Sequence, residues 1–222
     1  MIPWEELDTA AVPDGGQLRL MRRGAEFSIM AGAVELMNSR VRGSEEALAT
    51  LSLERLRDRA NPNILIGGLG MGFTLRAALA MRPDLRITVA ELVPAVVAWA
   101  RGPLAPVFAG SLDDPRVAVV VGDVGPMIRS ARKDWDAILL DVDNGPGGLS
   151  RAANDSLYAA NGLRAAHTAL RPGGVLAVWS SHPDSGFTRR LQQAGFAVEE
   201  LPVRAHGRRG ARHLIWMATR DR

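Results

Sequence analysis

Closely spaced glycines follow a short apolar run near residue 65 and carry the most informative chemistry in this chain. The apolar run covers residues 64–66, and residues 73–81 after the glycines have the composition of a helix. A strand, a glycine turn and a helix let a backbone approach a nucleoside closely, because glycine has no Cβ atom and adopts positive φ. Phe73 stands where the dinucleotide motif G-x-G-x-x-G has its third glycine, so a dinucleotide is not indicated. The glycines expected beside the ligand are Gly67, Gly68, Gly70 and Gly72.

Two acidic side chains follow the next two apolar runs. Glu91 ends residues 86–91, about twenty residues beyond the glycines, and Asp123 follows residues 117–121. The first carboxylate can accept hydrogen bonds from ribose hydroxyls, and the second can accept one from the adenine amino group. Together with the G-x-G-x-G spacing, which is that of S-adenosylmethionine enzymes, they predict an adenosine-containing cofactor of this type. The residues expected at these strand ends are Glu91, Leu92, Asp123 and Val124. Close packing of the glycine turn and an N-cap role for Asp123 are the alternative interpretations.

A third polar cluster ends the apolar run at residues 136–141. The catalytic candidates are Asp141, Asp143 and Asn144. A cationic sulfonium is attacked by a polar nucleophile, and a protein contributes mainly positioning and electrostatics to that step. Asp141 could therefore anchor an amine or take its proton, and a loop-capping role is the structural alternative. No histidine or glutamate pair has metal-ligand spacing, so no metal is expected.

The chain contains four histidines, and one of them is a candidate for the site. His182 follows the apolar run 175–180 and would lie at the ligand-binding edge of a sheet. His167 is expected to pack on its helix, and His206 and His213 are expected on the surface of a basic hairpin.

These residues need a parallel sheet to bring them together. From residue 63 onward, apolar runs alternate with helical segments, and residues 196–203 and 213–219 form a closing antiparallel pair. The pattern predicts an α/β, Rossmann-like fold with a mostly parallel seven-stranded sheet and helices on both faces. All candidates then gather at the carboxyl ends of the strands.

The segment before residue 60 has a different pattern. Residues 17–41 read as three short strands separated by glycine turns, which predicts a small antiparallel β extension. A helix with Ser44 as its N-cap is expected to follow, and Asn61-Pro62 would end it. We expect two units: residues 1–60 as the extension plus helix, and residues 61–222 as the S-adenosylmethionine-binding domain.

Composition excludes several classes of protein. The 222 residues are 47% hydrophobic with a mean hydropathy of zero, and the apolar runs are too short to span a membrane. The start of the chain lacks the features of a secretory signal, so a cytoplasmic location is expected. The absence of cysteine excludes disulfides, thiolate catalysis and cysteine-ligated zinc.

The basic residues point weakly to nucleic acid. The sequence pI is about 10.4, but the formal net charge is only +3. Basic side chains cluster between Arg204 and Arg212, where a solvated hairpin tip and an RNA-contacting loop are both possible interpretations.

Residues 17–200 resemble the spermidine synthase (polyamine aminopropyltransferase) family, which has the class I S-adenosylmethionine methyltransferase fold. The motifs that carry the resemblance lie at Ile66–Arg76, Leu112–Asp123, Trp135–Asp143 and Leu170–Val178. The resemblance implies that Glu91 binds the ribose, Asp123 the adenine region and Asp141 the attacking amine of a small-molecule acceptor. It also implies a homodimer, and S-adenosylmethionine or its decarboxylated form as the cofactor.

Several positions depart from the family pattern. The family aspartate that holds the aminopropyl end falls at Gly70, and the second carboxylate of its D-S-x-D motif falls at Asn144. The family Tyr-His-Glu of the polyamine pocket falls at Ala49, Thr50 and Leu51. Burying a dication without paired acids costs several kcal/mol, so aminopropyl transfer and methyl transfer both stay open. A non-catalytic nucleoside-binding homologue and an RNA methyltransferase using the basic loop are also consistent with the sequence.

Overall fold

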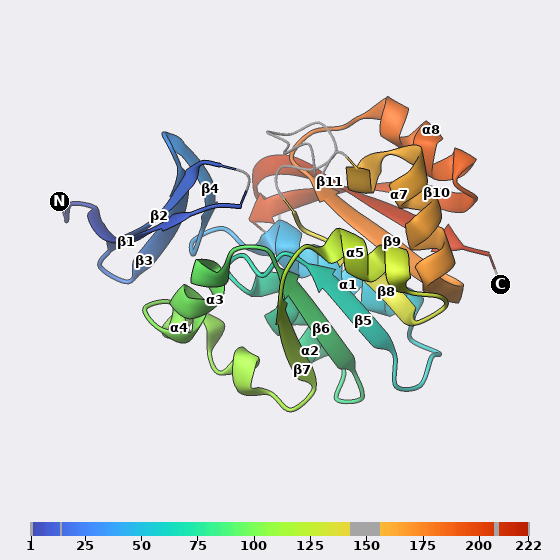
Figure 1. Ribbon diagram of the computed structural model, residues 1–222, viewed down its shortest axis with the longest axis horizontal. Helices are drawn as coiled ribbons and strands as arrows, with labels where there is room; N and C mark the ends of the chain where they lie inside the picture. Colours follow the sequence, from blue (N-terminus) through green and yellow to red (C-terminus); the bar gives the residue numbers. More distant parts are fainter. Residues whose placement is uncertain (1, 14, 143–155, 207–208, 222) are drawn as a thin grey trace.

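Two β-sheets organise the molecule in the computed structural model, which describes residues 2–13, 15–142, 156–206 and 209–221. A small sheet from the N-terminal part lies to one side of a larger sheet that is flanked by helices (Figure 1). The predicted α/β architecture with an N-terminal antiparallel extension is confirmed.

The larger sheet has seven strands in the order β10-β11-β9-β8-β5-β6-β7. Neighbours from β9 to β7 are parallel, and β11 pairs antiparallel with both β9 and β10. Side chains alternate between the two faces, so Ile64 and Ile66 face one core while Leu65 faces the other. The strands are β5 (Asn63–Gly67), β6 (Arg86–Glu91), β7 (Val117–Val121), β8 (Trp135–Leu140), β9 (Leu170–Ser180), β10 (Phe196–His206) and β11 (Arg209–Arg220).

Helices cover both faces of this sheet. Helices α1 (Gly43–Arg55), α2 (Phe73–Met81) and α3 (Pro94–Arg101) contribute to one core, together with α4 (Ala105–Phe108) and the 3-10 turn η1 (Ser111–Asp113). Helices α5 (Val124–Ser130), α7 (Ala160–Ala169) and α8 (Ser185–Gln193) form the other core and lie in front of the sheet in Figure 1. No helix in the described part of the chain is long and apolar enough to cross a membrane.

The small sheet has four antiparallel strands in sequence order. They are β1 (Glu5–Ala11), β2 (Gln17–Arg23), β3 (Glu26–Ala31) and β4 (Val34–Asn38). Buried residues of β2 and β3, such as Leu20 and Ile29, belong to the same core as α1 to α3. The indole N–H of Trp99 on α3 also donates to Asp8 on β1 at 2.6 Å, so the small sheet packs against α3.

The start of α1 differs from the prediction. Ser44 is not the N-cap: the helix begins at Gly43 after Arg42, with no side-chain capping hydrogen bond. Ser44 is instead buried in the first turn, where its hydroxyl is held by other partners. The helix also ends at Arg55, several residues earlier than Asn61-Pro62.

A buried carboxylate secures the amino end of the central strands. The side chain of Asp136 on β8 is fully buried and forms ion pairs with Arg59 at 2.6 Å and Arg171 at 2.8 Å. It also accepts a hydrogen bond from the backbone N–H of Asn63, the first residue of β5. This network links β5 and β9 to β8 at the amino ends of these three strands.

Candidate active site

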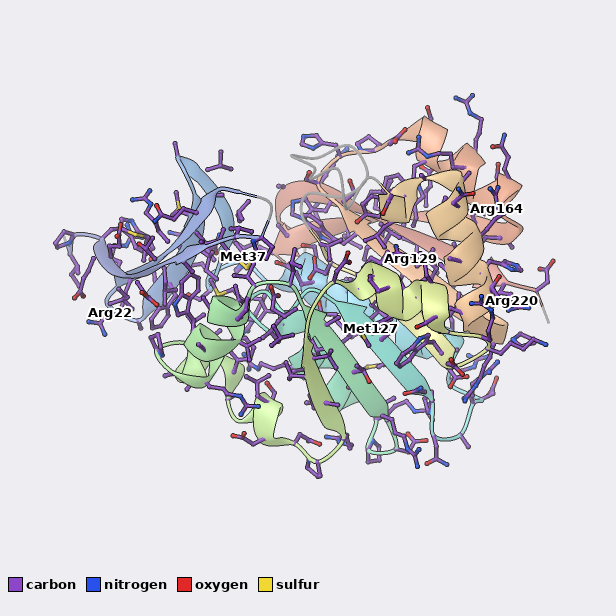
Figure 2. All side chains as sticks on the ribbon, in the orientation of Figure 1. Arg22, Met37, Met127, Arg129, Arg164 and Arg220 are labelled. Carbon is purple, nitrogen blue, oxygen red and sulfur yellow. The ribbon has the colours of Figure 1, made fainter. Side chains whose placement is uncertain are left out.

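A cavity of about 290 Å³ lies at the carboxyl ends of β5, β6, β7 and β8. The small sheet supplies the opposite wall, and Met37 lies where the two sheets meet (Figure 2). The predicted residues that line the cavity are Gly68, Gly70, Glu91, Leu92, Asp123, Val124 and Asp141. Asp143 and Asn144 lie outside the described residues. The structure therefore brings together the glycine turn and the acidic ends of three strands.

The predicted glycines differ in physical role. A Cβ atom on Gly68, whose φ is +90°, would lie 2.5 Å from the carbonyl oxygen of Asp141. A Cβ on Gly72, with φ of +77°, would lie 2.4 Å from the ring of Phe108. Gly70 leaves space in the cavity, since a Cβ atom there would lie 3.5 Å from the sulfur of Met37, which is an ordinary van der Waals contact. Gly67 and Gly72 serve packing and are not among the described lining residues.

Glu91 fixes the glycine turn from the end of β6. Its two carboxylate oxygens accept the backbone N–H groups of Leu69 at 2.9 Å and Val93 at 2.8 Å. The residue is only 7% exposed, and this burial raises the pKa of Glu91, while the backbone hydrogen bonds oppose the rise. The backbone N–H groups of Gly70 and Leu92 also interact with this carboxylate, so Glu91 holds the shape of the glycine turn beside the cavity.

Asp123 lines the cavity and also caps a helix. Its Oδ1 accepts the backbone N–H of Gly125 at 2.7 Å, which makes Asp123 the N-cap of α5. The capping interpretation is thus confirmed. The cap uses only one carboxylate oxygen, so the other could still bind adenine, and this role stays a prediction.

Asp141 follows β8 and has an unusual proton affinity. The hydroxyl of Thr74, in the first turn of α2, donates to its Oδ2 at 3.1 Å. Burial, and secondarily the charge of Glu45 on α1, raise the pKa of Asp141 to about 7, against the effect of the Thr74 hydrogen bond. A carboxylate with this pKa can accept a proton near neutral pH, as a general base requires.

Some residues near the site carried no sequence motif. Gln17, Leu18 and Leu36 line the cavity from the small sheet, and their strands are separated from the glycine turn by a helix. Thr74 and Glu45 lie in the first turns of two helices that meet beside Asp141. The acidic first turn of α1 was visible in the sequence, but only the packing of α1 on α2 indicates what it faces.

The prediction for His213 was wrong. His213 is partly buried: its ring packs edge-on against Trp179 at 4.8 Å, and its Nδ1 lies 2.9 Å from the Ser44 hydroxyl. Burial lowers the pKa of His213, and nearby His182 adds to this. His182 lies just beyond β9, with its Nδ1 2.8 Å from the hydroxyl of Ser181.

Two further predictions concern ions and polyanions. Among the residues described, no group of three or more histidine or acidic side chains could hold a metal ion. The basic segment Arg204–Arg212 forms the tip of the β10–β11 hairpin, and Arg212 is exposed there. Part of this tip lies outside the described residues, and its role stays a prediction.

A comparison with known protein families identifies the family of this chain. Residues 43–186, well over half of the chain, match the Spermine/spermidine synthase domain. The chain belongs to this family. The site at the strand ends, from Gly68 to Asp141, falls within the matched residues.

Curated relatives of this spermidine synthase family member are similar over part of their length. "Polyamine aminopropyltransferase 1" of Streptomyces coelicolor is 33% identical over 149 residues, which are 64% of this chain and 27% of the relative. "Polyamine aminopropyltransferase" of Mycobacterium tuberculosis strain H37Rv is 36% identical over 156 residues, 66% of this chain and 29% of the relative. "Putrescine N-methyltransferase 2" of Nicotiana tabacum is 36% identical over 118 residues, 52% of this chain and 32% of the relative. The chain spans about a third or less of these relatives.

Solved structures agree in fold. A spermidine synthase from Thermotoga maritima has a TM-score of 0.76 at 19% identity, covering 96% of this chain and 72% of that one. A spermidine synthase in complex with the transition state analogue AdoDATO has a TM-score of 0.77 at 18% identity, with the same coverages. A precorrin methyltransferase from Geobacter metallireducens has a TM-score of 0.55 at 18% identity, covering 78% of this chain and 87% of that one.

Proposed function

We propose that the cavity binds decarboxylated S-adenosylmethionine and that the protein transfers its aminopropyl group to an amine. The observation that carries the proposal is the charge of the wall: Glu91, Asp123 and Asp141 are acidic, and no described lining residue is cationic. Decarboxylated S-adenosylmethionine carries two positive charges and no carboxylate, so it complements this wall better than S-adenosylmethionine does. The relatives named polyamine aminopropyltransferases support the same choice.

Each acidic residue of the cavity would have a separate role in this reaction. Glu91 would accept hydrogen bonds from the ribose hydroxyls, and Asp123 would accept one from the adenine amino group, since both residues line the cavity. The donor supplies a sulfonium whose attached carbon is open to nucleophilic attack. Asp141 would orient the attacking amine and take the proton that it releases, which its raised pKa allows.

Methyl transfer from S-adenosylmethionine is the second candidate. Gly70 favours it, because the family aspartate that would hold an aminopropyl end is absent there. The relative named putrescine N-methyltransferase belongs to the same comparison and supports it. The two reactions share the adenosine site and the acceptor, and differ in the carbon that is transferred.

Product analysis separates these reactions. The protein is incubated with each donor and a panel of amines, and the nucleoside products are measured. Aminopropyl transfer releases methylthioadenosine from the decarboxylated donor, and methyl transfer releases S-adenosylhomocysteine. We expect methylthioadenosine, and a loss of about a hundredfold or more in kcat for Asp141→Asn. Neither product with any amine would contradict the proposal and favour a non-catalytic homologue.

A further inference from the structure

A second cavity, of about 670 Å³, lies beside α1 and α2. We call it the α2 cavity; the described residues that line it come from α1, α2 and the segment 108–114. None of these described residues lines the active-site cavity. Phe108 lines the α2 cavity, and its ring lies 2.4 Å from the position that a Cβ atom on Gly72 would take. The α2 cavity is therefore one side chain away from the glycine turn.

Arg76 supplies an uncompensated positive charge to the wall of the α2 cavity. It is the one cation among the described lining residues, and it is half-buried. Its Nη1 donates to the backbone carbonyl of Val107 at 2.7 Å, and it forms no ion pair within the described part of the chain. A guanidinium has five N–H donors, so this hydrogen bond leaves others for a ligand. Burying a charge costs free energy unless it is paired, so an anion at this position would stabilise Arg76.

The acidic residues of the same wall already have partners. Glu46 pairs with Arg42 at 3.3 Å, and Asp114 pairs with Arg116 at 2.7 Å. The hydrogen bond from the Arg116 side chain lowers the pKa of Asp114 to about 2, so Asp114 is ionised and paired at neutral pH. Because both acids are neutralised by their partners, Arg76 determines the sign of the charge that the cavity presents. That charge attracts an anion.

Ser111 adds an unused hydrogen-bond donor to this wall. The residue is only 8% exposed, and its hydroxyl has no hydrogen-bond partner among the described residues. Buried polar groups are nearly always hydrogen-bonded. A hydroxyl and a guanidinium can both donate to an anionic group, whereas a cationic ligand would be repelled by Arg76. The polar end of the ligand is therefore an anion, such as a carboxylate.

The rest of the wall is largely apolar. Leu79 and Met81 of α2 and the ring of Phe108 line the cavity together with small side chains. Met81 is 40% exposed, so an apolar group of a ligand could cover it. Apolar walls with a few convergent polar groups are typical of small-molecule sites. We infer that the α2 cavity binds a small organic anion with an apolar body, held at its charged end by Arg76 and Ser111.

Three ligands that differ in one feature each test this site. Hexanoate has the anionic end and the apolar body, hexanamide lacks the charge, and acetate lacks the body. Each is titrated into protein that is isotope-labelled at the methionine methyl groups and followed by NMR. The Met81 signal reports the α2 cavity, while Met37 reports the active-site cavity and Met127 lies on α5 (Figure 2). We expect hexanoate to shift the Met81 signal with a Kd of about 1 mM, and the other two ligands to bind at least about tenfold more weakly.

Substitutions identify the residues that hold the anion. R76Q should reduce the affinity for hexanoate to that for hexanamide, because the charge is lost. S111A should weaken hexanoate binding by about threefold to tenfold without destabilising the fold, since the hydroxyl has no described partner to lose. R57Q removes an equal charge from a side chain that is 82% exposed, and it should leave the affinity unchanged. R76K keeps the charge and should keep part of the preference for hexanoate if R76Q folds poorly.

The α2 cavity can be tested independently of the active site. Equal affinities for hexanoate and hexanamide in the unchanged protein, or equal hexanoate affinities of R76Q and R57Q, would overturn the inference. A shift of the Met37 signal without a shift of the Met81 signal would also overturn it, because the anion would then occupy the active-site cavity. The titration needs no donor and no turnover, so its result does not depend on the proposed function.

Discussion

At the scale of residues, the glycine turn is shaped by what lies across from it. Gly68 donates its backbone N–H to Ala90 on β6, and Asp141 donates its own to Gly67. These bonds bring the carbonyl oxygen of Asp141 so close to Gly68 that no Cβ atom fits between them. The turn that would face the donor and the carboxylate that would face the acceptor are therefore one rigid unit.

Substituting Gly68 tests this unit. Gly68→Ala should weaken donor binding by at least about tenfold, because the turn must move away from Asp141. Gly110→Ala is the matched control: Gly110 also has positive φ, at +78°, but nothing lies within 4 Å of its Cβ position. Both should lose about 1–2 kcal/mol of unfolding free energy from backbone strain, and only Gly68→Ala should lose more. Unchanged donor affinity of Gly68→Ala in calorimetry would contradict this account.

Local motifs made part of the site predictable. The glycines, Glu91 and Asp123 stand at ends of apolar runs, so their meeting at one edge follows from a parallel sheet. Gln17 could not be found this way, because it reaches the cavity through packing between distant segments. The biochemical roles of the cavity residues stay predictions.

At the scale of elements, the cavity and the ion pairs of Asp136 lie at opposite ends of the parallel strands. The cavity lies at the carboxyl ends of the parallel strands, and Asp136 lies at the amino end of β8 with its two arginines. Strands β5 and β8 between them are buried and apolar, which made them predictable from the sequence. Strand β1, EELDTAA, was missed because it has no apolar alternation and is defined by its pairing with β2.

Asp136→Asn should destabilise the fold. The substitution leaves Arg59 and Arg171 without their counter-charge, so we expect a loss of about 3 kcal/mol in the free energy of unfolding by urea denaturation. Asp113→Asn is the control, since its pair with Arg101 is exposed and should contribute under about 1 kcal/mol. Equal effects of the two substitutions would show that the Asp136 network does not anchor the strands.

At the scale of the whole molecule, the small sheet and the large sheet share one core and one cavity. Leu20 and Ile29 of the small sheet pack into the core of α1 to α3, and Leu18 and Met37 line the cavity. The donor would therefore be bound between the two sheets. The division near residue 60 and the homodimer stay predictions.

The central claim is that this acidic cavity recognises an adenosyl sulfonium by its charge. Titration calorimetry of decarboxylated S-adenosylmethionine, S-adenosylmethionine and methylthioadenosine into the unchanged protein tests it most directly. The account predicts affinity in that order, which is the order of net charge from +2 to +1 to zero, with the first ligand binding in the micromolar range. No binding of any of the three below millimolar concentration, or tightest binding of neutral methylthioadenosine, would contradict it.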